Sequence, residues 1–261
     1  MNQYPASFPE DVEPAPTTPQ PVYVRMPSTP TTVTFVLIGV TVAMYLLQML
    51  SVAIWGYAIY DIGWLEVYGA RINSGLRAGE LWRFITPVFL HGSVAHIFFN
   101  MYALFNIGSF LEQQMGHGRF VLLYFLSGFA GNVFSFLFTG EGSYSVGAST
   151  AVFGLIGAQA VFFYQNRELF GAQARSAIGS TVFIIAINLF IGMSPGIDNW
   201  GHIGGLLGGA LFALLASPLW KVAGMPPELY LEDERESRDV LTASGVVAIV
   251  FGLLAAWGMF R

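Results

Sequence analysis

Four side chains that could act as a nucleophile, a base or an oxyanion donor lie at or near the beginnings of apolar stretches in this sequence. They are Ser149, His202, His96 and Asn100. A serine hydroxyl becomes a nucleophile when a base takes its proton, and a neutral imidazole is the usual base. An attacked carbonyl group also needs hydrogen-bond donors for its developing oxyanion. These residue types favour nucleophilic catalysis by Ser149 with His202 as the base, provided that the fold brings them together.

The composition indicates a polytopic membrane protein. Of the 261 residues, 54% are hydrophobic and only 10% are charged, whereas soluble domains carry about 25% charged residues. The chain holds 30 glycines, and small residues let membrane helices pack closely. It has no cysteine, which excludes disulfides, thiolate metal sites and a cysteine nucleophile. The net charge of −5 lies mostly in two short segments and gives no reason to expect a nucleic-acid partner.

Seven apolar stretches each approach the ~20 residues that a helix needs to span a bilayer. They are roughly 33–55, 94–113, 120–139, 147–164, 177–193, 201–217 and 241–260. We therefore predict an all-α fold with a six-helix core at 31–217, a long loop at 56–93 within it, and a seventh transmembrane helix at 241–261.

The remaining segments are predicted to be solvated. Residues 1–30 hold eight of the 13 prolines and are expected to form a disordered tail. Residues 218–240 are expected to be a charged linker on the same side of the membrane. With the tail in the cytoplasm, seven Lys and Arg residues fall inside and four outside, so the positive-inside rule favours a cytoplasmic N-terminus. The start of the chain does not resemble a signal peptide, and we expect a multi-pass protein of a bacterial plasma membrane.

Helix parity predicts that the candidate side chains meet. The second, fourth and sixth stretches run in the same direction because one return helix separates each from the next. His96, Ser149 and His202 begin these three stretches, so they should lie at one depth, near the outer face. Asn100 is four residues after His96 and shares its helical face.

Glycines should let two of these helices approach closely. Gly205 and Gly209 follow His202 on the same helical face, in a small-xxx-small pattern that permits close backbone contact. The Ser149 N–H, at a helix N-terminus, could serve as an oxyanion donor together with His96 and Asn100. Asp198 is expected to belong to the preceding loop, so we predict a Ser–His dyad and no triad.

The motifs resemble those of rhomboid intramembrane serine proteases. Gly-Ala-Ser-Thr at 147–150 resembles the family's GxSx motif, and 201–209 resembles its catalytic-histidine helix. Segments 82–83 and 91–100 resemble the loop-one and second-helix signatures, and Glu112 matches a family glutamate. The resemblance covers about 81–216.

This resemblance implies roles for individual residues. Ser149 would be the nucleophile, His202 the base, and His96, Asn100 and the Ser149 N–H the oxyanion hole. Phe153 would pack its ring on His202, with Gly147 and Gly205 in supporting positions. The seventh stretch implies the six-plus-one form of the fold.

The resemblance also implies the kind of substrate and the absence of a cofactor. Substrates would be single-span or polytopic membrane proteins, cleaved near the outer face and admitted past the 177–193 helix and the loop with Gly196. Neither a cofactor nor a metal is implied. Thr150 departs from the glycine common after the family's serine, and it could narrow the site or alter access to Ser149.

Other interpretations remain open at this point. The chain could be an inactive rhomboid-like protein that binds membrane clients, although such relatives usually lose the serine and histidine. A transporter or channel is disfavoured because the sequence has no inverted repeat. A metal site at His91, His96 and His202 is disfavoured because no HExxH pattern is present. We expect structural roles for His91, Arg83 and Glu112, and assign no role to His117.

Overall fold

The structure is a computed structural model that describes residues 24, 26–59, 61–225 and 228–261. The predicted tail at 1–30 therefore lies almost entirely outside the described residues. The long helices are α1 (Thr32–Trp55), α4 (Val94–Ala103), α5 (Ser109–Phe138), α6 (Ser149–Gln165), α8 (Ala172–Ile191), α9 (Asn199–Ala216) and α10 (Ser237–Met259). A π-helical segment, η3 (Leu104–Gly108), joins α4 to α5, and the short helix α7 (Arg167–Phe170) precedes α8.

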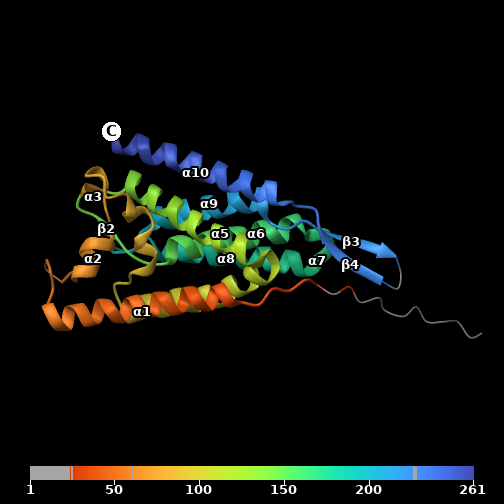
Figure 1. The fold of residues 1–261 in the computed structure, drawn as a ribbon, viewed down its shortest axis with the longest axis horizontal. Helices are drawn as coiled ribbons and strands as arrows, with labels where there is room; N and C mark the ends of the chain where they lie inside the picture. The colour runs from red at the N-terminus through yellow and green to blue at the C-terminus, as the bar shows by residue number, and fades with distance from the viewer. Residues whose placement is uncertain (1–23, 25, 60, 226–227) are drawn as a thin grey trace, which may run out of the picture.

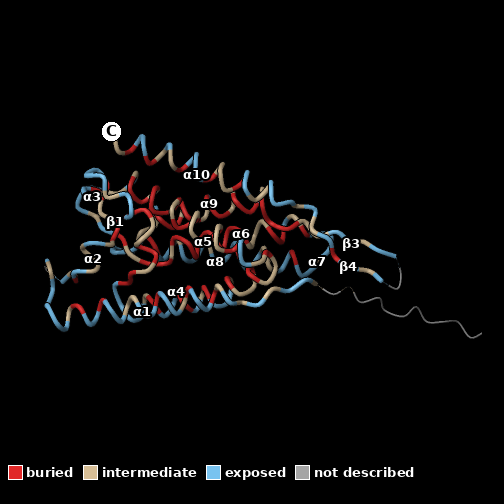
Figure 2. Tube along the Cα trace, in the orientation of Figure 1, coloured by how far each residue is buried: buried red, intermediate tan, exposed pale blue. Residues whose placement is uncertain are grey.

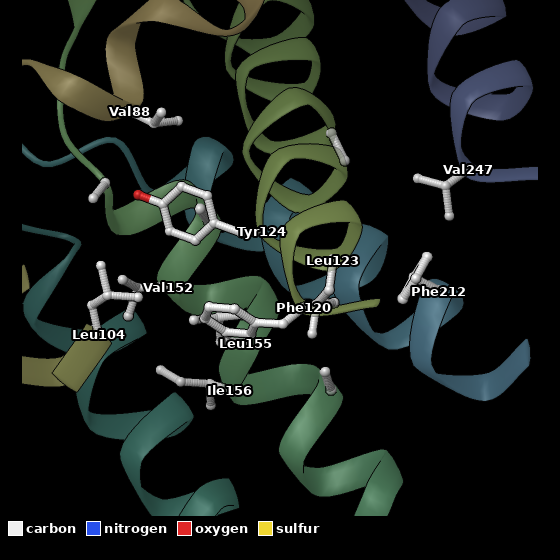
Figure 3. Packing of buried hydrophobic residues seen from close by; sticks show 14 of the residues in the cluster. Val88, Leu104, Phe120, Leu123, Tyr124, Val152, Leu155, Ile156, Phe212 and Val247 are labelled. Atoms are coloured by element: carbon white, nitrogen blue, oxygen red, sulfur yellow. The ribbon is translucent and has the colours of Figure 1, made fainter. Parts of the chain in front are cut away.

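Three central helices, α5, α6 and α9, form the core of the bundle. α1 and α10 run along opposite flanks of this core, as Figure 1 shows. Buried residues concentrate in the central helices, whereas the outward sides of α1 and α10 are exposed (Figure 2). The core side chains labelled in Figure 3 come mainly from these helices: Phe120, Leu123, Tyr124, Val152, Leu155, Ile156 and Phe212, with Val247 of α10 beside them.

The exposed side chains of the outer helices are apolar, as expected for a bundle surrounded by lipid. Leu46 of α1, Phe183 of α8 and Leu253 of α10 are all more than half exposed. Among the residues that the structure describes, five helical segments are long and apolar enough to cross a membrane, and one of them is the 45-residue segment at Val94–Phe138. Inside a bilayer, helices satisfy their own backbone polar groups, so an all-α polytopic membrane fold accounts for both observations.

The 45-residue segment contains two of the predicted stretches, separated at Gly116. Gly116 has φ 79° and ψ 165°, which breaks the helix within α5, and a positive φ is readily adopted only by glycine. Just before the break, the buried carboxylate of Glu112 accepts hydrogen bonds from the backbone N–H groups of Val33 and Thr34, both 2.7 Å. Glu112 therefore satisfies N–H groups at the start of α1.

His117 also takes part in this junction, which corrects our expectation that it has no role. Its Nδ1 lies 2.6 Å from Glu112 Oε1. The carboxylate of Glu112 is completely buried, and a buried charge requires hydrogen-bond partners. His117 supplies one of them because the break at Gly116 turns the chain back there.

The loop at 56–93 is folded and attached to the core. It contains α2 (Trp64–Gly69), β1 (Arg71–Ile72), α3 (Asn73–Arg77), η1 (Leu81–Phe84) and η2 (Thr86–Phe89). β1 pairs antiparallel with β2 (Tyr144–Ser145), in the connection that leads to Ser149. Asn132 of α5 donates a hydrogen bond to the carbonyl of Phe84, 2.9 Å, and ties η1 to the bundle.

The 218–240 segment differs from the plain linker that we expected. It forms an antiparallel hairpin of β3 (Trp220–Met225) and β4 (Glu228–Asp233) at the end of the bundle opposite the 56–93 loop (Figure 1). Asp233 accepts a hydrogen bond from Arg119, 2.5 Å, which anchors the hairpin to α5. The many charged residues of this segment predicted a solvated linker. They do not predict the hairpin, because its two strands are stabilised by hydrogen bonds to each other.

Candidate active site

Ser149 and His202 lie in hydrogen-bond contact. Nε2 of His202 is 3.0 Å from Oγ of Ser149. Ser149 is the first residue of α6 and His202 lies in the first turn of α9, so the parity of the helices brings the two together. His202 is 7% exposed and Ser149 is partly exposed. A neutral imidazole in this position can accept the serine proton.

The ring of Phe153 holds the imidazole plane. The two rings are stacked with centroids 4.1 Å apart and an interplanar angle of 5°. Nδ1 of His202 has no hydrogen-bond partner among the described residues. Asp198 instead caps α9, because its Oδ1 accepts the N–H of Gly201 at 2.9 Å. This geometry contains a Ser–His pair without a carboxylate on the imidazole.

Glycines set how closely α6 and α9 approach each other. A Cβ atom at Gly205 would overlap the carbonyl oxygen of Thr150, and one at Gly209 would overlap that of Gly154. Only residues without a side chain allow these backbones to touch. The short distance between Ser149 and His202 therefore depends on glycines one and two turns further along α9.

Thr150 lies in a helix junction behind the serine. It is 3% exposed, and its side chain packs where Cβ atoms at Gly131 of α5 and Gly201 of α9 would stand. Two glycines thus make room for the threonine. The residue that departs from the family pattern fills space between α5, α6 and α9.

His96 lies against the loop that leads to the serine. Gly147 has φ 132°, and a Cβ atom there would stand 2.7 Å from both Cε1 and Nε2 of the His96 ring. The N–H of Gly147 donates to the carbonyl of Pro87, 2.9 Å, which fixes the loop. The N–H of Ser149 belongs to the first turn of α6, where backbone donors have no partner within the helix. His96 and this N–H thus flank Ser149.

Asn100 is buried on the same helix, one turn after His96. Its side-chain N–H donates to the carbonyl of His96, 3.1 Å, within α4. The second N–H of the amide remains available. Its role as an oxyanion donor stays a prediction.

His91 supports the same loop from behind. It is 1% exposed, and its Nε2 lies 3.4 Å from the backbone N–H of Ala148, from which it accepts a hydrogen bond. Burial, together with the neighbouring His96, lowers the pKa of His91 to about 3. His91 is therefore neutral at physiological pH and able to act as an acceptor. Within the described part of the chain, no three His, Asp or Glu residues gather as a metal site.

Arg71 is a residue near the site that no sequence pattern singled out. It is 1% exposed, and its guanidinium lies 3.8 Å from the carboxylate of Asp198. An arginine in a loop with mixed charges is expected to be solvated. Only the tertiary fold makes it a buried cation.

The fold and this arrangement define a polytopic helical membrane protein with a Ser–His pair near one end of its helices. The Rhomboid domain family matches residues 78–219, which is more than half of the chain. The chain belongs to the rhomboid family.

Relatives extend the similarity beyond this domain. Over 190 residues the chain is 39% identical to rhomboid protease GluP of Bacillus subtilis (strain 168), which covers 72% of this chain and 35% of GluP. It is 44% identical over 157 residues to RHOMBOID-like protein 1 of Arabidopsis thaliana, which covers 59% of this chain and 40% of that protein. It is 40% identical over 179 residues to RHOMBOID-like protein 2 of the same plant, which covers 67% of this chain and 56% of that protein. The chain spans between about a third and just over half of the length of these relatives.

Proposed function

We propose that this protein is an intramembrane serine endopeptidase that cleaves transmembrane segments of other membrane proteins. The observation that carries the proposal is the 3.0 Å contact between Nε2 of His202 and Oγ of Ser149, in a member of the rhomboid family. One relative, GluP, is named a rhomboid protease. The proposed substrates are single-span or polytopic membrane proteins, and no cofactor takes part.

The proposed reaction is acyl transfer through Ser149. As Oγ attacks the scissile carbonyl carbon, Nε2 of His202 takes its proton. Three groups donate hydrogen bonds that stabilise the oxyanion: the backbone N–H of Ser149 and the side chains of His96 and Asn100. His202 then gives its proton to the leaving amine, and water, activated by the same imidazole, hydrolyses the acyl-enzyme. The stacked Phe153 ring keeps the imidazole aligned through both steps.

The membrane dictates where this reaction takes place. A peptide bond inside a helix is hydrogen-bonded and shielded, so substrates with helix-unwinding residues are favoured. Water must reach Ser149, which favours a reaction near a membrane face over one at the centre of the bilayer. The positive-inside rule favours a cytoplasmic N-terminus, and with this orientation the face that holds Ser149 is the outer one. We assign the protein to a bacterial plasma membrane.

Substrate entry past α8 is part of the proposal. Only Ala174 and Thr181 of this helix are buried, so few contacts hold it to the core. Gly196, with φ +89°, lies in the loop between α8 and α9. A cross-link between α4 and α8 that leaves cleavage of a membrane substrate unchanged would rule out this entry route.

The test compares the wild type with Ser149→Ala on a single-span membrane substrate in proteoliposomes. Ser237→Ala, at an exposed serine that begins α10, is the matched control. We expect cleavage by the wild type and the control and none by Ser149→Ala. Equal cleavage by all three would refute the serine mechanism. No cleavage by any would favour the alternative function, a rhomboid-like protein that binds membrane clients without cutting them.

A further inference from the structure

Arg71 is a buried cation at the end of the molecule that holds Ser149 and His202. Its side chain is 1% exposed. One guanidinium nitrogen donates to the side-chain oxygen of Asn73, 2.6 Å, and to the hydroxyl and carbonyl oxygens of Ser143, 3.2 and 3.3 Å. The other terminal nitrogen lies 3.8 Å from Oδ2 of Asp198. A buried charge is costly unless it is paired and hydrogen-bonded. Arg71 meets both conditions through its two terminal nitrogens, whereas its Nε has no partner among the described residues.

Asp198 connects this cation to the helix of the histidine. One carboxylate oxygen accepts the N–H of Gly201, 2.9 Å, and the other accepts a hydrogen bond from the hydroxyl of Ser135. The backbone carbonyl of Asp198 accepts the N–H of His202, 3.1 Å. The position of Asp198 therefore fixes the first turn of α9, on which the imidazole lies.

The same arginine also holds the segment that leads to the serine. Arg71 pairs with Ser145 across the β1–β2 ladder, and its side chain binds Ser143. Ser149 follows Ser145 by four residues. One residue thus touches both the connection before the nucleophile and the cap of the histidine helix.

We propose that Arg71 is a positioning residue for the Ser149–His202 pair. By joining residues 143–145 to Asp198, its guanidinium sets the distance between the serine hydroxyl and the imidazole. This inference rests on the proposed proteolytic function, which it deepens. Small displacements matter at such a site, because misplacing a reacting group by about 1 Å can cost about a hundredfold in rate.

A merely structural role predicts different behaviour, and Arg77 provides the comparison. Arg77 lies six residues after Arg71 in the 56–93 loop. It caps a different helix, since it donates to the carbonyl of Gly258 at the end of α10, 2.8 Å. It pairs with Glu141, 2.9 Å. Neither contact reaches Asp198. Loss of Arg77 therefore removes a helix cap and an ion pair without touching α9.

The experiment measures kcat and KM for a single-span membrane substrate in proteoliposomes, with Arg71→Gln, Arg71→Lys and Arg77→Gln in the full chain. The rate of Ser149 phosphonylation by a fluorophosphonate, in which Oγ displaces fluoride from phosphorus, and the melting temperature are recorded for each. We expect Arg71→Gln to lower kcat and the phosphonylation rate by about ten- to a hundredfold with KM within about twofold. Arg71→Lys should recover part of this loss, and Arg77→Gln should stay within about twofold of wild type in kcat.

The outcomes separate the two proposals. A kcat for Arg71→Gln equal to wild type, or an equal loss in Arg77→Gln, would overturn the role of Arg71 while leaving the serine mechanism intact. Absence of Ser149-dependent cleavage in the wild type would overturn both. If Arg71→Gln yields no folded protein, Ser135→Ala takes its place, because it removes a second donor to Asp198. Unchanged kcat and phosphonylation rates in both Ser135→Ala and Arg71→Lys would then contradict the proposal.

Discussion

Gly147 lies between the His96 ring and the serine. Its φ of 132° is accessible to glycine and strained for other residues, and a Cβ atom there would meet the imidazole of His96 at 2.7 Å. The loop before α6 can therefore bring the backbone against His96 only with glycine in this position. The geometry gives a physical reason for the glycine in the GxSx motif.

We expect Gly147→Ala to lower kcat for a membrane substrate by about a hundredfold, because the new methyl group displaces an oxyanion donor. The strained backbone should also lower the free energy of unfolding by about 1–3 kcal/mol. Gly92→Ala is the matched control, since its Cβ atom would meet nothing nearer than 3.9 Å. Kinetics and thermal melting of both variants check this, and equal activity in the two would contradict it.

The buried His91 predicts a pH dependence of stability. Folded His91 takes up a proton only near pH 3, whereas the unfolded chain does so near 6.5. The unfolded state therefore binds more protons between these values, and the free energy of unfolding falls as the pH is lowered through this window, by up to about 1.4 kcal/mol per pH unit. The measurement is the free energy of unfolding between pH 4.5 and 7, in steps of ~0.5 pH unit.

The comparison for this prediction is His91→Gln, which keeps a hydrogen-bond acceptor and cannot titrate. Its stability should depend less on pH than that of the wild type. The same slope in wild type and His91→Gln would show that another group is responsible.

At the residue scale, sequence patterns predict the groups that chemistry requires and miss those that burial creates. Ser149, His202, His96 and Phe153 follow from residue type, spacing and family resemblance. The surroundings of Thr150 and Arg71 do not. Thr150 packs against glycines of two other helices, and Arg71 is buried by a two-residue β-pairing with a segment more than 70 residues away. No local pattern records such contacts.

At the element scale, the contact between α6 and α9 brings the serine and the histidine together. Gly205 and Gly209 touch the backbone of α6, whereas Gly204 and Gly208 face Phe134 and Ala130 of α5. α9 is therefore held between two helices by glycines on both sides. Any side chain added on the α6 side must push the histidine helix outward.

We expect Gly205→Val to separate α6 from α9 and to lower kcat by at least about a hundredfold, because Ser149 and His202 lose hydrogen-bond contact. Gly252→Val on α10 is the control, since a Cβ atom there has nothing within 4 Å. The measurement is cleavage of the same substrate by both variants, with melting temperatures recorded alongside. Retention of wild-type kcat in Gly205→Val would show that the close approach is dispensable.

Elements follow from the sequence where hydrophobic periodicity determines them. The seven apolar stretches correspond to helices because a bilayer leaves the backbone few alternatives. The hairpin of β3 and β4 and the short helices of the 56–93 loop depend on pairing and capping between segments, which composition does not encode. The break at Gly116 falls between the predicted stretches 94–113 and 120–139, at a residue type that readily adopts a positive φ.

At the scale of the whole molecule, the two ends of the bundle carry different structures. The folded 56–93 loop lies at one end and the β3–β4 hairpin at the other (Figure 1). The Ser–His pair is at the end of the 56–93 loop, because Ser149 begins α6 four residues after β2, which pairs with β1 of that loop. The proposed orientation puts the hairpin in the cytoplasm. Because the chain has no cysteine of its own, single introduced cysteines can report this orientation without background.

We expect Met225→Cys, at a hairpin position that is 83% exposed, to resist a membrane-impermeant maleimide in intact bacterial cells and to react after lysis. Gly142→Cys, in the turn before Ser149 where nothing lies within 4 Å, should react in intact cells. Mass-shift assays on gels distinguish the two. The reverse labelling pattern would contradict the proposed orientation.

The most direct test of the proposed mechanism is covalent labelling of the serine itself. Purified wild-type protein in detergent is treated with a fluorophosphonate, and the modified residue is identified by mass spectrometry. We predict a single adduct at Ser149 whose formation rate falls by at least about a hundredfold in His202→Ala, because the imidazole is the base. Phe153→Leu should label more slowly than wild type and faster than His202→Ala. An adduct at another serine, or equal labelling of Ser149 with and without His202, would contradict the Ser–His mechanism.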